Sequence, residues 1–414
     1  MISKYHEAYV WIWLPDSTKP IVAGKLIQQQ QQLQFNYGQS YLNNPNAISI
    51  YTKELPLIKG NIPLINGLKM PSCIRDGSPD AWGRRVIINR LTGVNSHQSE
   101  FDELTYLLES GSDRIGALDF QLSPSEYSPR LAKSVSLEEI QYSASKVEQG
   151  LPLSPKLDQA LNHGTSIGGA RPKALIEDDG IKYIAKFSSS TDLYNVIKAE
   201  FIAMKLAKLA GLNVAEVKLG EASNKDILLI KRFDRFYHGK QEYRRILLSA
   251  LTLFGLDEMM ARYASYEQLA EIIRYDFSKP KATLKELFSR MVFNILCGNT
   301  DDHARNHAAI WDGKGLHLSP AYDICPQART GNEASQAMLI HHNERLSQLA
   351  TCMKSIHHFM LEKEQALTII HHQINVINQF WQEVCEQAGL SLVDRNYLWQ
   401  RQFLNPSVFY GFKG

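Results

Sequence analysis

Residues 299–307 read NTDDHARNH and follow the apolar run LFSRMVFNILCG, residues 287–298, which predicts a buried helix. Two aspartates and two histidines therefore stand at the end of a core segment. Asp301 and Asn306 have the D-x-x-x-x-N spacing of a kinase catalytic loop. In such a loop the aspartate accepts the proton of the substrate hydroxyl and the asparagine holds a metal ion. Phosphoryl-transfer chemistry is one interpretation of the stretch, beside two alternatives.

The first alternative is a zinc site. His303 and His307 are four residues apart, as in H-E-x-x-H, but Ala304 occupies the position of the general base, so a zinc-protease interpretation fails on chemistry. The second alternative is a capped loop, because Asn and Asp hydrogen-bond their own backbone in turns. The nine residues alone leave the loop and the kinase interpretations open.

Size and composition predict a globular protein of two or three domains. The chain has 414 residues, 44% of them hydrophobic, and a net charge of +2, which does not by itself demand nucleic acid or a membrane surface. Five scattered cysteines without a C-x-x-C pair predict reduced thiols. No apolar run approaches the roughly 18 residues of a membrane span, and the N-terminal stretch YVWIWLPD does not resemble a secretion signal. We therefore expect a cytoplasmic protein.

Patterning along the chain predicts three parts. Residues 1–125 contain short β-branched and aromatic strands, residues 8–14 and 19–26, and a capped helix start at SPDAW. Ser/Pro-punctuated sequence from about 125 to 155 marks a surface connection. Residues 126–235 alternate strands with a helix, and the third part, residues 236–414, is expected to be mostly helical, with an almost wholly helical pattern from Tyr263. The expected fold class is α+β.

The C-terminal helix and the histidine pairs carry no predicted chemistry. In the helix of residues 363–384 the expected core seam, spaced by three and four, is Leu367, Ile370, Ile374, Ile377, Trp381 and Val384. The pairs 341–342, 357–358 and 371–372 are interpreted as surface or helix-packing histidines, with metal binding as the lesser alternative.

Other parts that phosphoryl transfer needs lie upstream of the loop. HGTSIGGARPKALIEDDGIKYIAKF, residues 163–187, contains a glycine-rich turn and two strands. Its turn is neither G-x-G-x-x-G nor Walker A. Lys186 ends the second strand, as the lysine of V-A-I-K does in protein kinases. Glu200 lies on the following helix, where it could pair with Lys186 and orient it. Taken singly, these two residues would more often be surface groups.

The remaining parts lie in kinase order. DILLIKRFDR, residues 226–235, predicts a strand and a hinge whose backbone could bond an adenine edge, although Phe233 could equally be a core residue. Residues 307–322 predict a hairpin that returns Asp323 to the catalytic loop as a second metal-binding carboxylate. The order of glycine loop, strand lysine, helix glutamate, hinge, D-x-x-x-x-N, hairpin and aspartate favours a kinase.

The sequence resembles the HipA family of serine/threonine kinases, the toxin half of bacterial toxin–antitoxin modules. The resemblance rests on SIGGARPKA, YIAKF, KAEFIAMKLAKLAGLNV, LLIKRFDR, GNTDDHARNH and LSPAYDI. In the N-terminal part it rests on VAGKL, FNYGQSYL, SPDAWGRR and SDRIGAL. It implies a two-lobed, kinase-like fold with an extra β-rich N-terminal subdomain, a lobe with the phosphate loop, and a helical lobe with the catalytic loop.

The resemblance implies ATP and Mg²⁺ as cofactors and gives roles to individual residues. Asp301 would be the catalytic base, and Asn306 and Asp323 the magnesium ligands. Ser166 would be the autophosphorylation site, with Thr165 as a second candidate. Phosphate there adds about −1.5 to −2 charge and would repel ATP from the loop. The ATP site would comprise Gly168, Gly169, Ala170, Arg171, Pro172, Lys173, Lys186, Glu200, Lys231, Arg232, Phe233, His303, Arg305 and Tyr322.

Partners are also implied by the resemblance. They are a HipB-like antitoxin, DNA only through that antitoxin, no membrane, and a protein substrate for which aminoacyl-tRNA synthetases are the precedent. The loop GGARPKA has Pro172 where the best-known members carry an acidic or amide residue, and YRRILLSALTLFGL lacks the acidic, glutamine-containing stretch of many members. Two alternatives therefore stay open, a small-molecule kinase and a catalytically silent antitoxin-binding corepressor.

Overall fold

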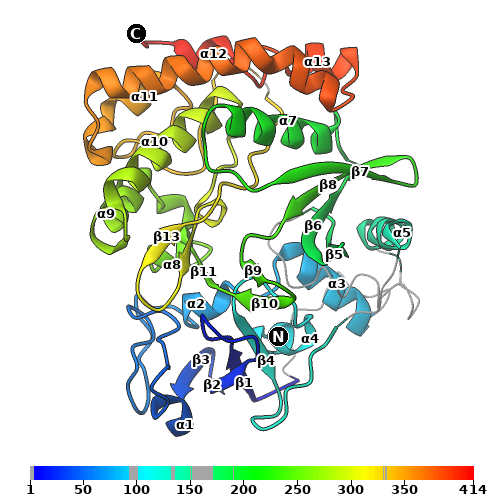
Figure 1. The fold of residues 1–414 in the computed structure, drawn as a ribbon, viewed down its shortest axis with the longest axis vertical. Helices are drawn as coiled ribbons and strands as arrows, with labels where there is room; N and C mark the ends of the chain where they lie inside the picture. Colours follow the sequence, from blue (N-terminus) through cyan, green and yellow to red (C-terminus); the bar gives the residue numbers. More distant parts are fainter. Residues whose placement is uncertain are drawn as a thin grey trace.

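The computed structural model describes residues 4–92, 101–131, 136–149, 151, 171–189, 191–329, 331 and 333–414. Its elements are arranged along one long axis (Figure 1). An N-terminal sheet lies at one end, a second four-stranded sheet lies in the middle, and the C-terminal helices lie at the other end. No helix among these residues is both long and apolar enough to cross a membrane.

The N-terminal sheet has the order β3-β2-β1-β4 and is antiparallel. Its strands are β1 (Glu7–Ile12), β2 (Ile21–Gln29), β3 (Gln32–Tyr37) and β4 (Leu118–Gln121). The first two strands lie where the sequence predicts them. Along β3, buried and less buried residues alternate, as expected for a strand with one face on the core. The short helices α1 (Gln39–Leu42), α2 (Ser72–Arg75) and α4 (Glu103–Glu109) accompany this sheet.

The middle sheet has the order β5-β6-β8-β7 and is also antiparallel. It consists of β5 (Lys173–Asp178), β6 (Ile181–Phe187), β7 (Val217–Ala222) and β8 (Lys225–Lys231). The helix α7 (Val196–Leu209) packs on β7 and β8, and its N-terminus is capped by Asn195, whose side chain accepts from Lys198 N. This is the predicted strand, strand, helix, strand arrangement around Lys186.

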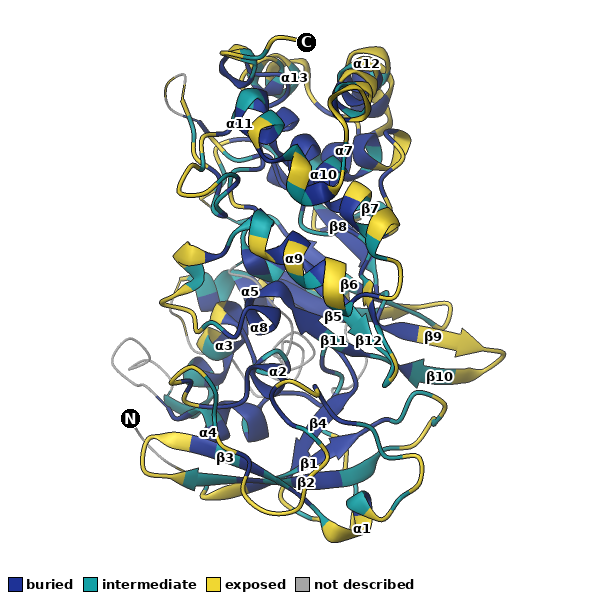
Figure 2. Ribbon diagram, turned by 90° about the vertical axis from the view of Figure 1, so that its left-hand side faces the viewer, coloured by how far each residue is buried: buried dark blue, intermediate teal, exposed yellow. Residues whose placement is uncertain are grey.

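Helices from two different sequence regions cover the opposite face of this sheet. Trp82 and Val86 belong to α3 (Ala81–Thr92), and Ile140 and Ala144 belong to α5 (Leu137–Glu148). These residues form one buried cluster with apolar residues of the middle sheet, including Phe187. In Figure 2 much of β5, β6 and β8 is correspondingly coloured as buried, whereas most of β7 is not. The N-terminal region therefore supplies part of the core of the lobe that carries Lys186.

The two β regions are also joined by a buried ionic network. Asp113 bonds Arg232 at 3.0 Å and Arg235 at 2.9 Å, and Asp234 bonds both arginines as well. Burial opposes ionisation of Asp113, but the surrounding cations hold its pKa well below the usual range. The hairpin β9 (Arg235–His238) and β10 (Gln241–Arg244) begins at this network. Because each charge in the network has an opposite partner, the interface is polar without leaving a buried ion uncompensated.

The C-terminal part is helical apart from one small sheet. That sheet has the order β11-β12-β13, formed by Ile246–Ser249, Ala308–Trp311 and Leu316–Leu318. The helices are α8 (Ala250–Leu253), α9 (Tyr266–Asp276), α10 (Pro280–Leu296), α11 (Leu349–Lys354), α12 (Lys363–Gln387) and α13 (Leu392–Leu398). Short 3₁₀ turns are η3 (Ala261–Tyr263), η4 (Ala304–Asn306), η5 (Ile356–Phe359) and η6 (Pro406–Phe409).

The predicted seam of α12 is confirmed in its main members. Ile370, Ile377, Trp381 and Val384 are buried, while Leu367 and Ile374 are only half-buried. The buried stripe also includes Ala366, Gln373 and Val376, so it is broader than the predicted one. The five cysteines are all buried free thiols, as the composition predicts.

Candidate active site

Lys186 lies between two carboxylates. Its Nζ is 2.6 Å from Glu200 Oε1 and also forms an ion pair with Asp323 Oδ1. Lys186 comes from β6, Glu200 from α7, and Asp323 from the segment after β13. Asp323 adopts a left-handed backbone conformation, with φ at 58°. The predicted pairing of Lys186 with Glu200 is therefore present, and the hairpin does return Asp323 to the same point.

The two carboxylates set the charge state of this cluster. Burial opposes the charge of Lys186, but Asp323 and Glu200 outweigh it and raise its pKa. Burial likewise opposes the ionisation of Asp323, and Lys186 brings the pKa of Asp323 down to about 2. Both groups are therefore charged at neutral pH. Burial raises the pKa of Glu200, and the charge of Lys186 opposes that effect.

The catalytic-loop candidate is held by its own backbone. The end of α10 is set by Gly298, with φ at 72°, where an added Cβ would meet Gln402 O at 2.7 Å. After it, the carbonyl of Asp301 accepts from His303 N at 2.8 Å and from Asn306 Nδ2 at 3.2 Å. The Asp301 carboxylate remains exposed. The amide of Asn306 is thus fixed beside it on η4.

The electrostatics of Asp301 come from its neighbours. Desolvation by the surrounding protein raises the pKa of Asp301; the charge of His303 lowers it, and the nearby Asp323 raises it again. Asn299 Nδ2 donates to the carbonyl of Asp323 at 3.3 Å, which links the two segments directly. The loop and the Lys186 cluster therefore form one site with two mutually repelling carboxylates.

The other charged residues of NTDDHARNH are structural. Asp302 and His307 are buried, with His307 Nε2 3.0 Å from Asp302 Oδ1. The hydroxyl of Tyr266 donates to the other oxygen of Asp302. This buried triad anchors the loop on α9. The geometry gives Asp302 and His307 a scaffold role.

Arg305 and Tyr322 brace the loop from outside. The hydroxyl of Tyr322 donates to the carbonyl of Arg305 at 2.6 Å, and the guanidinium of Arg305 pairs with Glu258. The ring of Tyr322 lies 5.4 Å from the ring of Phe233, centroid to centroid. Phe233 is partly buried against the main core. The predicted hinge and the segment leading to Asp323 are therefore in contact.

At the predicted hinge, two of the three side chains have other partners. The guanidinium of Arg232 is fully buried in the Asp113 network, and Lys231 Nζ lies 3.1 Å from Glu216. The backbone N–H groups of Lys231 and Arg232 donate to Glu216 O and Lys182 O. The N–H of Phe233 has no hydrogen-bond partner among the described residues. An adenine edge would therefore meet backbone here, and the charged heads of Lys231 and Arg232 are engaged elsewhere.

The phosphate-loop candidate is described only from Arg171 onward. Thr165, Ser166, Gly168, Gly169 and Ala170 lie outside the described residues. Arg171 forms a two-pronged ion pair with Asp192, at 3.0 and 2.6 Å. The carbonyl of Pro172 accepts from Phe187 N at 3.0 Å, which closes the β5–β6 pairing.

Lys173 has a partner that the sequence does not predict. Its Nζ lies 3.0 Å from Asp80 Oδ2, and both side chains are buried. Burial lowers the pKa of Lys173, while Asp80 opposes that effect. Asp80 belongs to the SPDAW stretch predicted only as a helix start, and its Oδ1 does accept from Gly83 N at 2.9 Å. Asp80 and Lys173 are 93 residues apart in the sequence, and local patterning does not reveal a contact between such distant residues.

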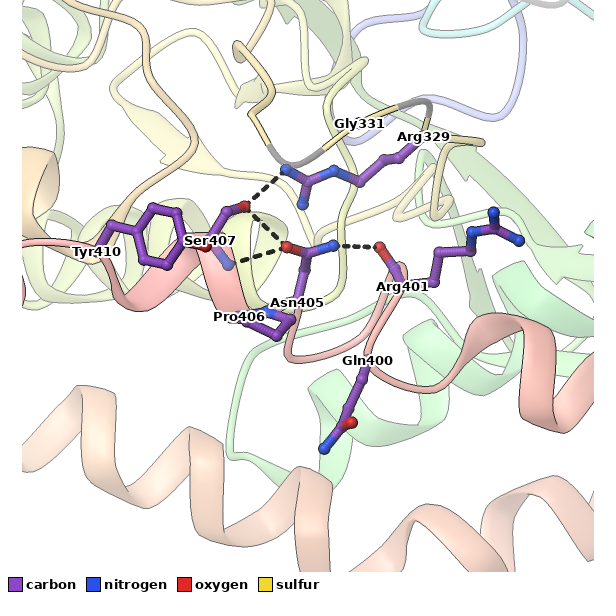
Figure 3. Close-up of a pocket in the computed structure, with 8 residues that line it drawn as sticks. All are labelled: Arg329, Gly331, Gln400, Arg401, Asn405, Pro406, Ser407 and Tyr410. Atoms are coloured by element: carbon purple, nitrogen blue, oxygen red, sulfur yellow. Dashed lines mark hydrogen bonds between the residues drawn. The ribbon is translucent and has the colours of Figure 1, made fainter.

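A separate cavity of about 310 Å³ lies near the C-terminus (Figure 3). In it, Arg329 donates to Ser407 Oγ at 3.1 Å, and Ser407 in turn bonds Asn405 at 2.8 Å. Among the described residues, none of those predicted for catalysis, ATP or metal binding lines this cavity. The polar groups that converge on Lys186 are therefore a distinct site.

Comparison with protein families gives matches at both ends of the chain. Residues 165–381 match the HipA-like C-terminal domain, and residues 13–121 match the HipA N-terminal domain. A protein of Sinorhizobium fredii named as a candidate kinase, Y4mE, is 25% identical over 268 residues, covering 58% of this chain and 60% of that protein. The serine/threonine-protein kinase toxin HipA of Shewanella oneidensis is 27% identical over 186 residues, covering 38% of this chain and 42% of that toxin. The chain thus spans less than two thirds of the length of these relatives.

Among solved structures, this chain is similar to one from the Shewanella oneidensis complex of HipA, HipB and operator DNA. The TM-score is 0.71 at 17% identity, over 97% of this chain and 99% of that one. At this identity the likeness concerns the fold alone. It confirms the predicted α+β, kinase-like architecture.

Proposed function

This chain belongs to the HipA family, and from that membership and the Lys186 cluster we propose that it is an ATP- and Mg²⁺-dependent serine/threonine protein kinase, the toxin of a bacterial toxin–antitoxin module. The observation that carries the proposal is the convergence on Lys186. Glu200 and Asp323 both bond its ammonium, and Asn299 ties Asp323 to the loop that bears Asp301. Phosphoryl transfer depends on such positioning and charge neutralisation.

Asp301 is the proposed general base. It would accept the proton of a substrate serine or threonine as the hydroxyl oxygen bonds the γ-phosphorus of ATP, while the bond from that phosphorus to the bridging oxygen breaks and ADP leaves. The raised pKa of Asp301 suits this role, because it makes the carboxylate a stronger base. Exposure of the carboxylate leaves it accessible to a protein hydroxyl.

The residues present fit a magnesium ion. Asp301 and Asp323 repel each other, as the raised pKa of Asp301 reflects, and a cation between the segments would relieve that repulsion. Asp323 and Asn306 would hold it through carboxylate and amide oxygens, the ligands that Mg²⁺ prefers. When bound, Mg²⁺ neutralises the negative charge of the phosphates. Lys186 would orient the phosphates, with Glu200 holding its ammonium in place.

The remaining parts of the ATP site follow the same scheme. The unengaged N–H of Phe233 supports adenine binding at the hinge, with Tyr322 against the ring of Phe233. Residues 168–173 are the proposed phosphate loop. Ser166 is the proposed autophosphorylation site, with Thr165 as the second candidate, and phosphate there would repel the ATP phosphates.

The biological setting is proposed from the relatives. The similar solved structure contains HipA, HipB and operator DNA, which supports a HipB-like antitoxin as the partner and contact with DNA through that antitoxin. An aminoacyl-tRNA synthetase is the proposed class of substrate, and the cytoplasm the proposed location. The exposed base favours a protein over a small metabolite, which a closed pocket would hold.

Incorporation of labelled phosphate tests the proposal. Purified protein with Mg²⁺ and labelled ATP should gain phosphate chiefly at Ser166, located by mass spectrometry. The Asp301→Asn variant should lose about 100- to 10,000-fold of the rate. Asp178→Asn, at an exposed ion pair on β5, is the matched control and should keep it. Label that persists in Asp301→Asn would show that the base is misassigned. Absence of phosphate transfer by the wild type, with ATP still bound, would favour a silent corepressor.

A phosphoproteome after brief induction identifies the substrate class. We expect new phosphoserine or phosphothreonine on a small set of proteins, absent with Asp301→Asn. Phosphate found only in metabolites would replace the protein-kinase assignment with a small-molecule kinase.

A further inference from the structure

Three side chains of types that bind metals, one glutamate and two histidines, lie close together at positions far from Lys186 in the sequence. Glu267 lies in the first turn of α9, His341 in the tight turn that follows Ile340, and His358 in η5. Glu267 Oε1 is 2.9 Å from His341 Nδ1 and 3.0 Å from His358 Nε2. The three donor atoms all lie within 4.8 Å of one another. One carboxylate oxygen therefore faces two imidazole nitrogens from different elements.

Simple ion pairing does not account for this group. The Nε2 atom of His358 is buried, yet it makes no hydrogen bond despite its distance from Glu267. A buried polar atom left without a hydrogen-bond partner is unfavourable. Burial lowers the pKa of His358; Glu267 opposes this, while the neighbouring histidines and Arg274 add to it. A lowered pKa favours the neutral imidazole, which is the form that donates a lone pair to a metal.

The surroundings supply further support for a cation. The backbone N–H of His342 donates to Glu267 Oε2 at 3.1 Å and so fixes the carboxylate, and His342 Nδ1 lies 3.7 Å from the same oxygen. The ring of His357 is 4.0 Å from that of His358, centroid to centroid. The imidazoles of His341, His342 and His358 therefore lie against one oriented carboxylate, and the ring of His357 lies beside that of His358. Hydrogen bonds that orient a ligand in this way are typical of protein metal sites.

We propose that Glu267, His341 and His358 form a binding site for a zinc-type divalent transition metal, with His342, His357 or water as the fourth ligand. Two imidazoles and one carboxylate suit Zn²⁺ and disfavour Mg²⁺ and Ca²⁺, which prefer oxygen ligands. With bonds of about 2.0–2.1 Å, tetrahedral donors stand roughly 3.3 Å apart. The two separations from Glu267 Oε1, 2.9 and 3.0 Å, are close to that value, and all three donor atoms lie within 4.8 Å of one another.

The position of the site gives it a structural consequence. Leu339 N donates to Ala264 O and Tyr266 N to Leu339 O, both at 2.9 Å, so the segment before His341 is pinned beside α9. Earlier in that segment, Ala337 N donates to Thr300 O at 3.0 Å. A bound metal would therefore link α9, η5 and the segment that contains His341. Through Ala337, that segment contacts Thr300, the residue before Asp301. Binding to the folded state alone would also raise the melting temperature.

Zinc titration of the full chain tests the proposal. The protein, free of any affinity tag and stripped with a chelator, is titrated with Zn²⁺ by calorimetry and by competition with a chromophoric chelator. We expect one tight site, a rise in Tm with Zn²⁺, and a visible absorption band with Co²⁺. Excess Mg²⁺ should not displace the metal.

Variants locate the metal. His341→Ala, His358→Gln and Glu267→Gln should each weaken Zn²⁺ binding by at least about 100-fold, because loss of even an outer-shell partner costs about 10- to 100-fold. His372→Ala, in an exposed histidine pair on α12, is the matched control and should bind as the wild type does. Circular dichroism checks that each variant is folded. Unchanged affinity in folded His341→Ala and His358→Gln, or a loss in His372→Ala, would overturn the assignment.

The zinc site is independent of the proposed kinase site. Asp301→Asn should bind Zn²⁺ with wild-type affinity, so a failure of phosphate transfer and a failure of zinc binding are seen separately. If Asp301→Asn lost zinc binding and His341→Ala retained it, the metal would lie in the catalytic loop. That outcome would contradict the proposal.

Discussion

The Nζ of Lys173 lies 3.0 Å from Oδ2 of Asp80, although 93 residues separate the two in the chain. Lys173 is the last residue of the predicted phosphate loop, and Asp80 stands at the start of α3. The electrostatic influence of Asp323 and Lys186 extends to Lys173 as well. The N-terminal region thus contributes a charge at the border of the proposed ATP site.

Removing the charge of Asp80 should lower the free energy of unfolding. Asp80→Asn would leave the Lys173 ammonium buried without its carboxylate, and breaking a buried pair in this way costs about 3–5 kcal/mol of unfolding free energy. Urea unfolding followed by circular dichroism measures the change. Asp178→Asn, at the exposed end of β5, should change stability by less than about 1 kcal/mol. Equal effects of the two substitutions would contradict the structural role of Asp80.

Lys186 should matter for nucleotide affinity. Lys186→Met removes the ammonium proposed to orient the phosphates, and the loss of a charged hydrogen bond of about 1.5–3 kcal/mol predicts roughly 10- to 150-fold weaker ATP binding. Titration with a fluorescent ATP analogue measures it. Glu200→Gln keeps the ammonium and should weaken binding less. The order of the two effects would be reversed if Glu200 contacted the nucleotide itself.

The buried triad beneath the loop should affect stability. Tyr266→Phe leaves Asp302 without one hydrogen bond in a buried site, and the expected loss is about 1–3 kcal/mol of unfolding free energy. Thermal unfolding measures the loss. Tyr275→Phe, on the same helix but with an exposed ring, is the control. A neutral Tyr266→Phe would show that His307 alone anchors Asp302.

The pH dependence of phosphate transfer should follow Asp301. The base works only when ionised, so the rate should fall as pH drops through the pKa of Asp301, which lies above 3.8. His303 lowers that pKa, and His303→Ala should therefore move the acidic limb of the pH–rate profile to higher pH. Initial rates of autophosphorylation between pH 4 and 8 measure it. His317→Ala, at an exposed position of β13, should leave the limb in place. A shift to lower pH in His303→Ala would contradict the assignment.

Local pattern was sufficient for much of the site. Spacing and strand propensity predict the strand of Lys186, the helix of Glu200 and the hairpin before Asp323, because each depends on neighbours in sequence. Their order then implies the convergence that the structure contains. The left-handed backbone of Asp323 was not predictable from a non-glycine residue.

Contacts between distant segments were not predictable. The guanidinium of Arg232 bonds Asp113, and Lys173 bonds Asp80, across more than 90 residues in each case. Each pair forms only because two regions that are distant in the sequence pack against each other. Local sequence patterns and composition do not predict that packing. The meeting of Glu267 with His341 and His358 is of the same kind, so the histidine pairs looked like ordinary surface groups in the sequence.

The covering of the middle sheet by α3 bears on how the protein can be divided. The matched family regions, residues 13–121 and 165–381, suggest two separable pieces. Cutting between them would expose the apolar surface that Trp82 and Val86 cover. A kinase fragment beginning after residue 125 should therefore be recovered as aggregate, and deletion studies of this protein need point substitutions in place of excised halves.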